Sequence, residues 1–141
     1  MEHAMTAFQR AEIVRALDAC NARTVRFGLT LSPEQMEQLA EGRFRALRET
    51  GRVEFGEGIL PRLVLAFCDS PYLQQEDWAE TLLLLQEVFY KFKNDFRDSI
   101  GDDTLLRLMR RAFDGRAHGA AELLADMTPP ELLGREDRDG P

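Results

Sequence analysis

The chain has 141 residues, of which 44% are hydrophobic and 30% charged, and its net charge is −7. These values are those of an ordinary globular domain, and they exclude a chain that is disordered along its body. The negative charge disfavours nonspecific binding to DNA or to an anionic membrane, because both attract positive charge. Cys20 and Cys68 lie among apolar neighbours, and we expect both to be buried free thiols.

The N-terminal segment carries an acidic side chain at Glu2 and lacks the apolar stretch of a secretory signal peptide. The longest apolar stretches, residues 63–68 and 82–85, are far shorter than the roughly 20 residues that a membrane-spanning helix needs. We therefore expect a cytoplasmic protein whose partner is neither a membrane nor a nucleic acid.

The first helix is predicted from a repeat of apolar residues. Ile13, Leu17 and Cys20 recur at helical spacing and predict a helix over about residues 6–23. Apolar residues then alternate through residues 25–31, and this pattern favours an extended connector.

The second helix has the clearest start signal in the chain. Ser32 is a favourable N-cap, Pro33 fits the first helical position, and Gln35 completes a capping box. Gly51 is expected to end this helix in the left-handed conformation. Gly42 lies inside the helix and indicates a close contact with another helix there.

The middle of the chain is predicted to contain a loop, a short helix and a turn. Residues 52–58 include two glycines and read as an irregular loop. A helix over residues 60–68 tolerates Pro61 in its first turn, whereas a strand over residues 59–67 is disfavoured by that proline and by the lack of partner strands. Residues 69–72 are predicted to form a turn.

The longest helix is predicted over about residues 75–98. Six large apolar residues are spaced alternately four and three apart in this segment: Trp78, Leu82, Leu85, Phe89, Phe92 and Phe96. Further apolar residues widen the face beyond a two-stranded coiled-coil seam, so this segment fits the central helix of a bundle.

The last third of the chain is predicted to contain shorter helices. A fifth helix begins at a cap formed by Asp102 or Asp103 and ends near Phe113. A sixth covers about residues 120–126, and residues 128–131 could begin one more turn. The predicted fold is therefore all-α: an irregular bundle of five to six helices around a long central helix (about residues 75–98). A single domain covers residues 1–133, and residues 134–141 form a disordered tail.

Catalytic and metal-binding patterns are weak in this sequence. His118 and Glu122 have i,i+4 spacing, but no second histidine or cysteine lies near them. No nucleophile elbow and no phosphate-binding loop is present. We expect no metal ion and no cofactor, and the sequence favours a non-catalytic protein over an enzyme.

Two sets of arginines are spaced along helices. Arg45, Arg48 and Arg52 belong to the second helix, whereas the fifth helix carries Arg107, Arg110 and Arg111. Either set could clamp an anion or an acidic partner. Pairing with the abundant surface carboxylates is the interpretation that we favour.

The loop and the turn on either side of the third helix supply the candidate site. We predict that residues 52–58 and 69–72 form one surface patch that binds a protein partner. Tyr72 is the best single contact, because its hydroxyl lies in a polar turn and needs a hydrogen-bond partner. The residues of this candidate patch are Arg52, Glu54, Phe55, Asp69, Ser70 and Tyr72.

Other hypotheses stay open at this point. A small-molecule-binding protein or an enzyme could use a cleft around Glu54, Asp69 and Tyr72, in which a desolvated carboxylate would have a shifted pKa. A structural role for Glu54 is the stronger interpretation: it would cap the third helix or pair with Arg52 or Arg62. Self-association through the central helix would give a homodimer.

Four segments resemble a known family. They are residues 27–35 (FGLTLSPEQ), 51–63 (GRVEFGEGILPRL), 66–72 (AFCDSPY) and 85–95 (LQEVFYKFKND). These segments are similar to an uncharacterised bacterial family, a domain of unknown function found mainly in Gram-positive anaerobes. The resemblance covers roughly residues 20–124. It implies a bacterial cytoplasmic protein, and it supplies no activity, cofactor or catalytic residue.

Overall fold

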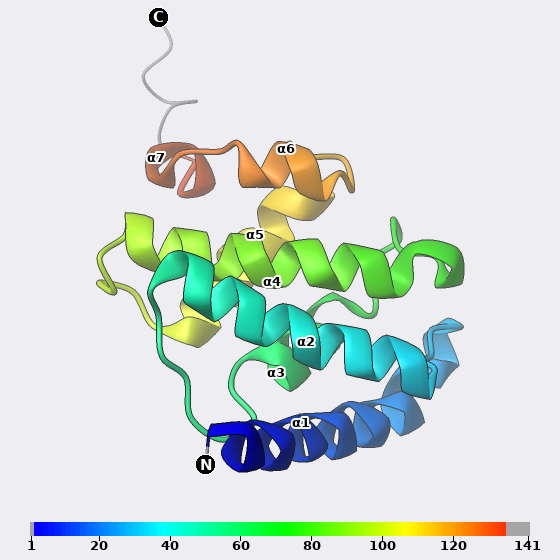
Figure 1. The fold of residues 1–141 in the computed structure, drawn as a ribbon. Coiled ribbons are helices and arrows are strands. Elements are labelled where there is room, and N and C mark those ends of the chain that lie inside the picture. Colours follow the sequence, from blue (N-terminus) through cyan, green and yellow to red (C-terminus); the bar gives the residue numbers. More distant parts are fainter. Residues whose placement is uncertain (1, 135–141) are drawn as a thin grey trace, which may run out of the picture.

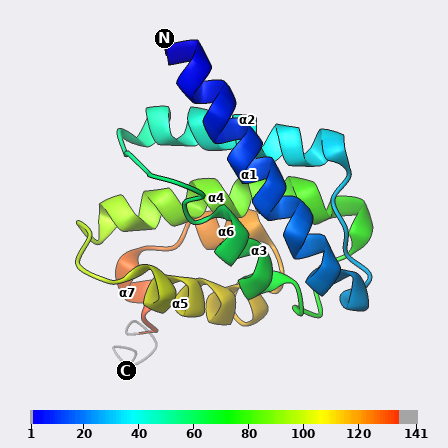
Figure 2. The ribbon, with the colours of Figure 1, turned by 90° about the horizontal axis from the view of Figure 1, so that it is seen from below.

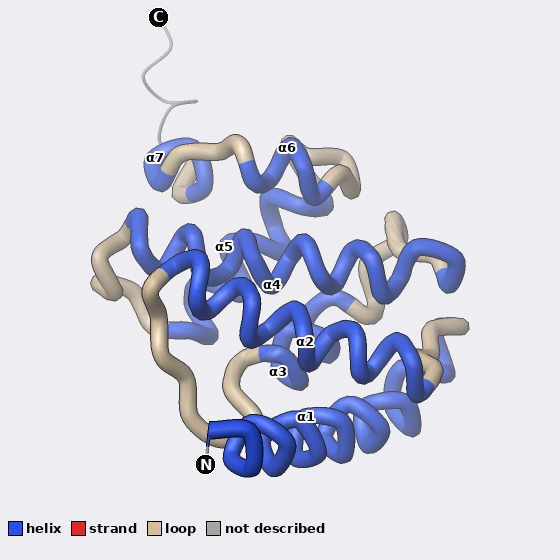
Figure 3. The backbone as a smooth tube through the Cα atoms, viewed as in Figure 1, coloured by secondary structure: helices blue, strands red, loops and turns tan. Residues whose placement is uncertain are grey.

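Seven α-helices form the part of the chain that the computed structural model describes, which is residues 2–134, with side chains from residue 7 onward (Figures 1 and 3). The helices are α1 (Glu2–Thr24), α2 (Pro33–Thr50), α3 (Leu60–Phe67), α4 (Trp78–Asp95), α5 (Asp102–Asp114), α6 (Ala121–Ala125) and α7 (Pro129–Leu132). No strand occurs within these residues. The all-α fold class is confirmed, and the turn expected near residue 128 adds the short helix α7.

The start of α2 forms as the sequence predicts. The Oγ of Ser32 accepts a hydrogen bond from the backbone N–H of Gln35 at 3.1 Å, and the Gln35 side chain accepts one from the Ser32 N–H at 2.9 Å. Gly51 ends the helix with a φ of 69°. The connector before α2 is less extended than expected, because a 3₁₀ turn, η1 (Val25–Phe27), precedes a left-handed Gly28.

Helix α4 lies at the centre of the bundle, and α2, α3, α5 and α6 all contact it. In Figure 1, α1 lies on one side of the α2–α4 pair, and α6 and α7 lie on the other. The predicted apolar face of α4 is buried at Trp78, Leu82, Leu85, Phe89 and Phe92. Buried side chains from all seven helices join them in one hydrophobic core.

The ends of the central helix differ from the expectation. Its first residues form a 3₁₀ turn, η2 (Gln75–Asp77). Its last residues leave the helix because Arg97 and Asp98 take left-handed φ angles of 56° and 58°, which end a right-handed helix.

Helices α2 and α4 pack closely at Gly42. A Cβ atom on this glycine would lie 2.5 Å from the Cδ2 of Leu83, which is far inside normal van der Waals contact. The predicted close helix–helix contact is therefore confirmed, and its partner is α4.

Several smaller expectations can be compared with the structure. Cys20 and Cys68 are buried free thiols, as expected. Helix α5 begins after Gly101 without a side-chain cap, so the expected cap at Asp102 or Asp103 is wrong. Among the described residues, no helix is long and apolar enough to cross a membrane. Residues 135–141 of the expected tail lie outside the described part of the chain.

Candidate functional site

The predicted patch divides into two groups at opposite ends of α3. The first group, Arg52, Glu54 and Phe55, belongs to the loop before the helix. The second group, Asp69, Ser70 and Tyr72, belongs to the turn that follows the helix. An eight-residue helix is about 12 Å long. The two groups share no hydrogen bond or ion pair among the described residues, and the binding role of each remains a prediction.

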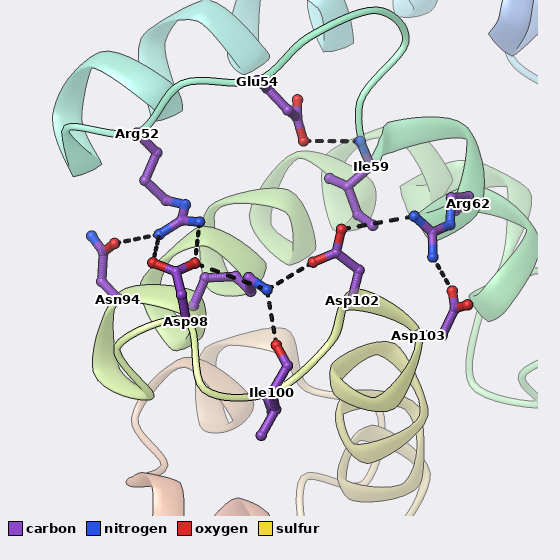
Figure 4. A network of polar contacts seen from close by, with 10 residues as sticks. Arg52, Glu54, Ile59, Arg62, Asn94, Asp98, Ile100, Asp102 and Asp103 are labelled. Atoms are coloured by element: carbon purple, nitrogen blue, oxygen red, sulfur yellow. Dashed lines mark hydrogen bonds and ion pairs between the residues drawn. The ribbon is translucent and has the colours of Figure 1, made fainter.

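Glu54 anchors the loop to the core of the bundle. Its Oε1 atom accepts hydrogen bonds from the Nε of Arg43 at 2.6 Å and from the Oη of Tyr90 at 2.7 Å. Its Oε2 atom accepts one from the backbone N–H of Ile59 at 2.9 Å (Figure 4). Ile59 is the N-cap residue of α3, so Glu54 holds the backbone at the start of this helix as a structural contact. Its ion-pair partner is Arg43 rather than Arg52 or Arg62.

Arg43 and Tyr90 make this anchor a buried one. The Arg43 side chain is 1% exposed, and its Nη2 atom also donates to the carbonyl oxygen of Gly56 at 3.2 Å. Burial, together with the Glu54 carboxylate, raises the pKa of the Tyr90 hydroxyl well above its ordinary value. Tyr90 therefore keeps its proton at neutral pH and donates it to Glu54.

Sequence reasoning missed Arg43, although a signal for it exists. Arg43 follows Leu39 by four positions and Ala40 by three, so it lies within the apolar stripe of α2. A charged residue in a buried stripe requires a partner of opposite charge. The nearest acidic residue of the following loop is Glu54.

The anchor turns two large apolar side chains of the loop toward solvent. Side chains alternate in direction along an extended backbone, and Glu54 points inward. Its neighbours Val53 and Phe55 are 74% and 85% exposed. Gly58 has a φ of 66°, and a Cβ atom there would collide with the Glu54 carboxylate. The glycine at this position is therefore needed for the anchored loop itself.

Arg52 ties the start of the loop to the C-terminal end of α4. Its Nη1 atom donates to Asn94 at 2.7 Å, and its Nη2 atom pairs with Asp98 at 2.6 Å (Figure 4). The hydrogen bond from Arg52 holds the pKa of Asp98 below its usual range. Lys93 extends the contacts to Asp102 at the start of α5, with a distance of 2.8 Å. These bonds engage Arg52 within the chain and hold the start of the loop.

The second group joins the α3–α4 turn to α5. Asp69 pairs with the Nη1 of Arg110 at 2.5 Å, and the Ser70 hydroxyl donates to Asp114 at 2.7 Å. Arg110 also donates to the carbonyl oxygen of Ala66 at 2.9 Å. The hydrogen bond from Arg110 lowers the pKa of Asp69. This arrangement is a network of structural contacts between two helices.

Tyr72 packs across the end of α5. Its ring lies edge-on to that of Phe113 with 6.4 Å between the centroids. A Cβ atom on Gly119 would come within 2.5 Å of the Tyr72 side chain. Tyr72 nevertheless stays 41% exposed, so part of its ring is open to a partner.

Of the three residues around which a cleft was expected, Glu54 precedes α3, whereas Asp69 and Tyr72 follow it. Asp69 lines a hollow of about 350 Å³ whose other walls include Arg23 and Arg26 of the α1–η1 segment. Among the described residues, no group of three or more histidine, cysteine, aspartate and glutamate side chains could hold a metal ion.

The model of one protein family matches residues 16–135, from the second half of α1 to beyond α7, and it is described as a family of unknown function (DUF6323). No curated protein and no solved structure matches the chain. The family carries no activity, cofactor or site residue over to these positions.

Proposed function

We propose that this chain, which belongs to the family of unknown function DUF6323, is a non-catalytic cytoplasmic module that binds a partner protein through the α2–α3 loop, residues 52–58. The observation that carries the proposal is the exposure of Val53 and Phe55 on a loop in which the residue between them, Glu54, is fixed by an ion pair with the buried Arg43. The protein partner expected from the sequence thus binds at the first group of the predicted patch, in the loop before α3.

The energetics of the loop support a binding role. Burying an exposed side chain of the size of valine or phenylalanine in an interface gains about 1.5–3 kcal/mol. A segment that is already ordered loses less conformational entropy on binding than a mobile one. The loop is held by Glu54 in its middle and by Arg52 at its start. It therefore presents its two apolar side chains in a preorganised form.

The alternative of a carboxylate-based enzyme has less support. Glu54 accepts three hydrogen bonds from within the chain, and Asp69 is paired with Arg110. Both carboxylates thus have structural roles, and they lie at opposite ends of α3.

Self-association through α4 also has less support. The apolar residues of that helix, Trp78, Leu82, Leu85, Phe89 and Phe92, are buried within the chain. A homodimer would need another surface, such as that of Val53 and Phe55. Light scattering of the purified protein separates this arrangement from a heterologous partner.

The test is capture of partners from an extract of the native cell. The double variant Val53→Ser, Phe55→Ser should lose the specific partner that the wild type retains. The matched control is Phe8→Ser, Leu123→Ser, which removes two other large exposed apolar side chains, 66% and 52% exposed. The control should retain the partner. Equal loss in both variants, or retention in the loop variant, would contradict the proposal.

A further inference from the structure

An open groove of about 670 Å³ runs between α3 and α5. Figure 2 shows these two helices side by side, with α1 on the other side of α3. The apolar part of the lining comes from Leu65, Ala66 and Leu106. Leu106 is 5% exposed and forms the floor, whereas Leu65 and Ala66 are half-buried on the wall.

Four arginines also line this groove, on a chain whose net charge is −7. Two of them are neutralised within the chain. Arg62 pairs with Asp102 and Asp103 at the start of α5 (Figure 4). Arg110 pairs with Asp69 and Asp114. The pairs of Arg62, and the pair between Arg110 and Asp69, connect the two walls of the groove.

The other two arginines, Arg107 and Arg111, have no carboxylate partner among the described residues, and both are exposed. Within the described part of the chain, Arg107 donates to the hydroxyl of Thr104 alone, at 3.3 Å. Residues four apart on a helix lie on one face, one turn apart. The groove thus combines an apolar floor with two positive charges, one helical turn apart, that no carboxylate of residues 7–134 neutralises.

We propose that this groove binds an acidic amphipathic helix of a partner protein. The apolar stripe of that helix packs on Leu65, Ala66 and Leu106, and two carboxylates one turn apart pair with Arg107 and Arg111. The charge complementarity and the matching helical spacing select this occupant. Helix-in-groove binding uses such an apolar channel with charged flanks. An open groove buries too little of a small molecule, which needs most of its surface enclosed.

The groove is distinct from the α2–α3 loop, and the two proposals can fail independently. The probe is a synthetic amphipathic peptide of about 18 residues, longer than α5, with leucines on one face and glutamates beside them. A second peptide carries glutamine in place of glutamate. Titration of the full chain is followed by NMR amide shifts and by fluorescence anisotropy of a labelled peptide.

We expect the glutamate peptide to shift amides of α3 and α5, and to bind more tightly than the glutamine peptide. Arg107→Gln with Arg111→Gln should weaken binding by about tenfold. The matched control is Arg45→Gln with Arg48→Gln, which removes two exposed arginines of α2 that have no carboxylate partner among the described residues. That control should change the affinity by less than about twofold.

A further variant, Leu65→Gln, removes part of the apolar wall and should weaken both peptides. The loop variant Val53→Ser, Phe55→Ser should bind the glutamate peptide as the wild type does. The proposal is overturned if the double variant at Arg45 and Arg48 weakens peptide binding as much as the one at Arg107 and Arg111. It is overturned as well if the NMR amide shifts map outside α3 and α5. It is also overturned if light scattering shows a dimer that the Arg107 and Arg111 substitutions dissociate, because a second copy would then occupy the groove.

Discussion

The Glu54 carboxylate illustrates how one side chain determines the direction of its neighbours. Three donors hold it, from α2, from α4 and from the residue before α3. This single inward side chain turns Val53 and Phe55 outward. The interaction surface proposed for the loop therefore depends on a residue that the partner does not need to touch.

Glu54→Gln should lower the free energy of unfolding by about 3–5 kcal/mol, because it leaves the buried Arg43 without its counter-charge. The glutamine amide has a single oxygen, so it can accept from Arg43 or from the Ile59 N–H but not from both. Its N–H₂ group would face the other donor without forming a hydrogen bond. Urea denaturation followed by circular dichroism measures the loss. The comparison variant Tyr90→Phe removes one hydrogen bond and should lose only about 1 kcal/mol. A loss for Glu54→Gln no larger than that for Tyr90→Phe would show that the charge pair is not the anchor.

At this scale, the sequence indicated a structural role for Glu54, either as a cap of the third helix or as a partner of Arg52 or Arg62. It did not identify Arg43, since an arginine on a helix is normally solvent-exposed, and only the loop folding back over α2 buries it. The exposure of Phe55 could not be predicted from its neighbours in the sequence either, because it follows from the inward direction of the Glu54 side chain.

At the scale of elements, the contact between α2 and α4 is set by a glycine against a leucine. Gly42→Val should lower the free energy of unfolding by about 1–3 kcal/mol, because the added side chain overlaps Leu83. Chemical denaturation measures this change. In a Leu83→Ala background the same substitution should lose much less, as a double-mutant cycle would show. An identical loss in both backgrounds would mean that the overlap with Leu83 is not the cause.

The elements with strong local signals were predictable, and those that depend on other elements were not. The boundaries of α2 follow from Ser32, Gln35 and Gly51, which act within one turn of the helix ends. The 3₁₀ turn at Val25–Phe27 has no such signal, because alternating apolar residues fit either a turn or an extended connector. The expected acidic cap of α5 was wrong because Gly101 takes the N-cap position, and Asp102 and Asp103 lie in the first turn of the helix, where they pair with Lys93 and Arg62.

At the scale of the whole molecule, surface ion pairs join helices that are distant in sequence. Arg110 lowers the pKa of Asp69, and Arg52 lowers that of Asp98. Both carboxylates thus bind protons less readily in the folded chain than in the unfolded one. Their contribution to stability is present above the ordinary aspartate pKa, about 4, and is lost as the pH falls through the lower folded values.

We therefore expect the free energy of unfolding to fall in acid, starting near pH 5. Urea denaturation between pH 7 and pH 3 measures this decrease. The double variant Asp69→Asn, Asp98→Asn should be less stable at neutral pH and should show a shallower decrease in acid. A variant with the same acid dependence as the wild type would show that other carboxylates dominate.

The fold class of the whole molecule was predictable, because apolar residues at helical spacing predict helices that each bury one face. This prediction does not require knowing which helix packs against which. The division of the candidate patch was not, since residues 52–58 and 69–72 are close in sequence and only the length of α3 separates them in space. The open groove between α3 and α5 could not be predicted for a similar reason: its two walls come from segments about 40 residues apart in the sequence, which meet only in the folded chain.

The most direct test of the proposed function is photo-crosslinking in the native cell with benzoylphenylalanine in place of Phe55. The control carries the same group at Leu123, which is also exposed but lies on α6. The account predicts a discrete crosslinked protein from position 55 that is missing from position 123. Crosslinks of the same pattern from both positions, or none from position 55, would contradict a binding role for the loop.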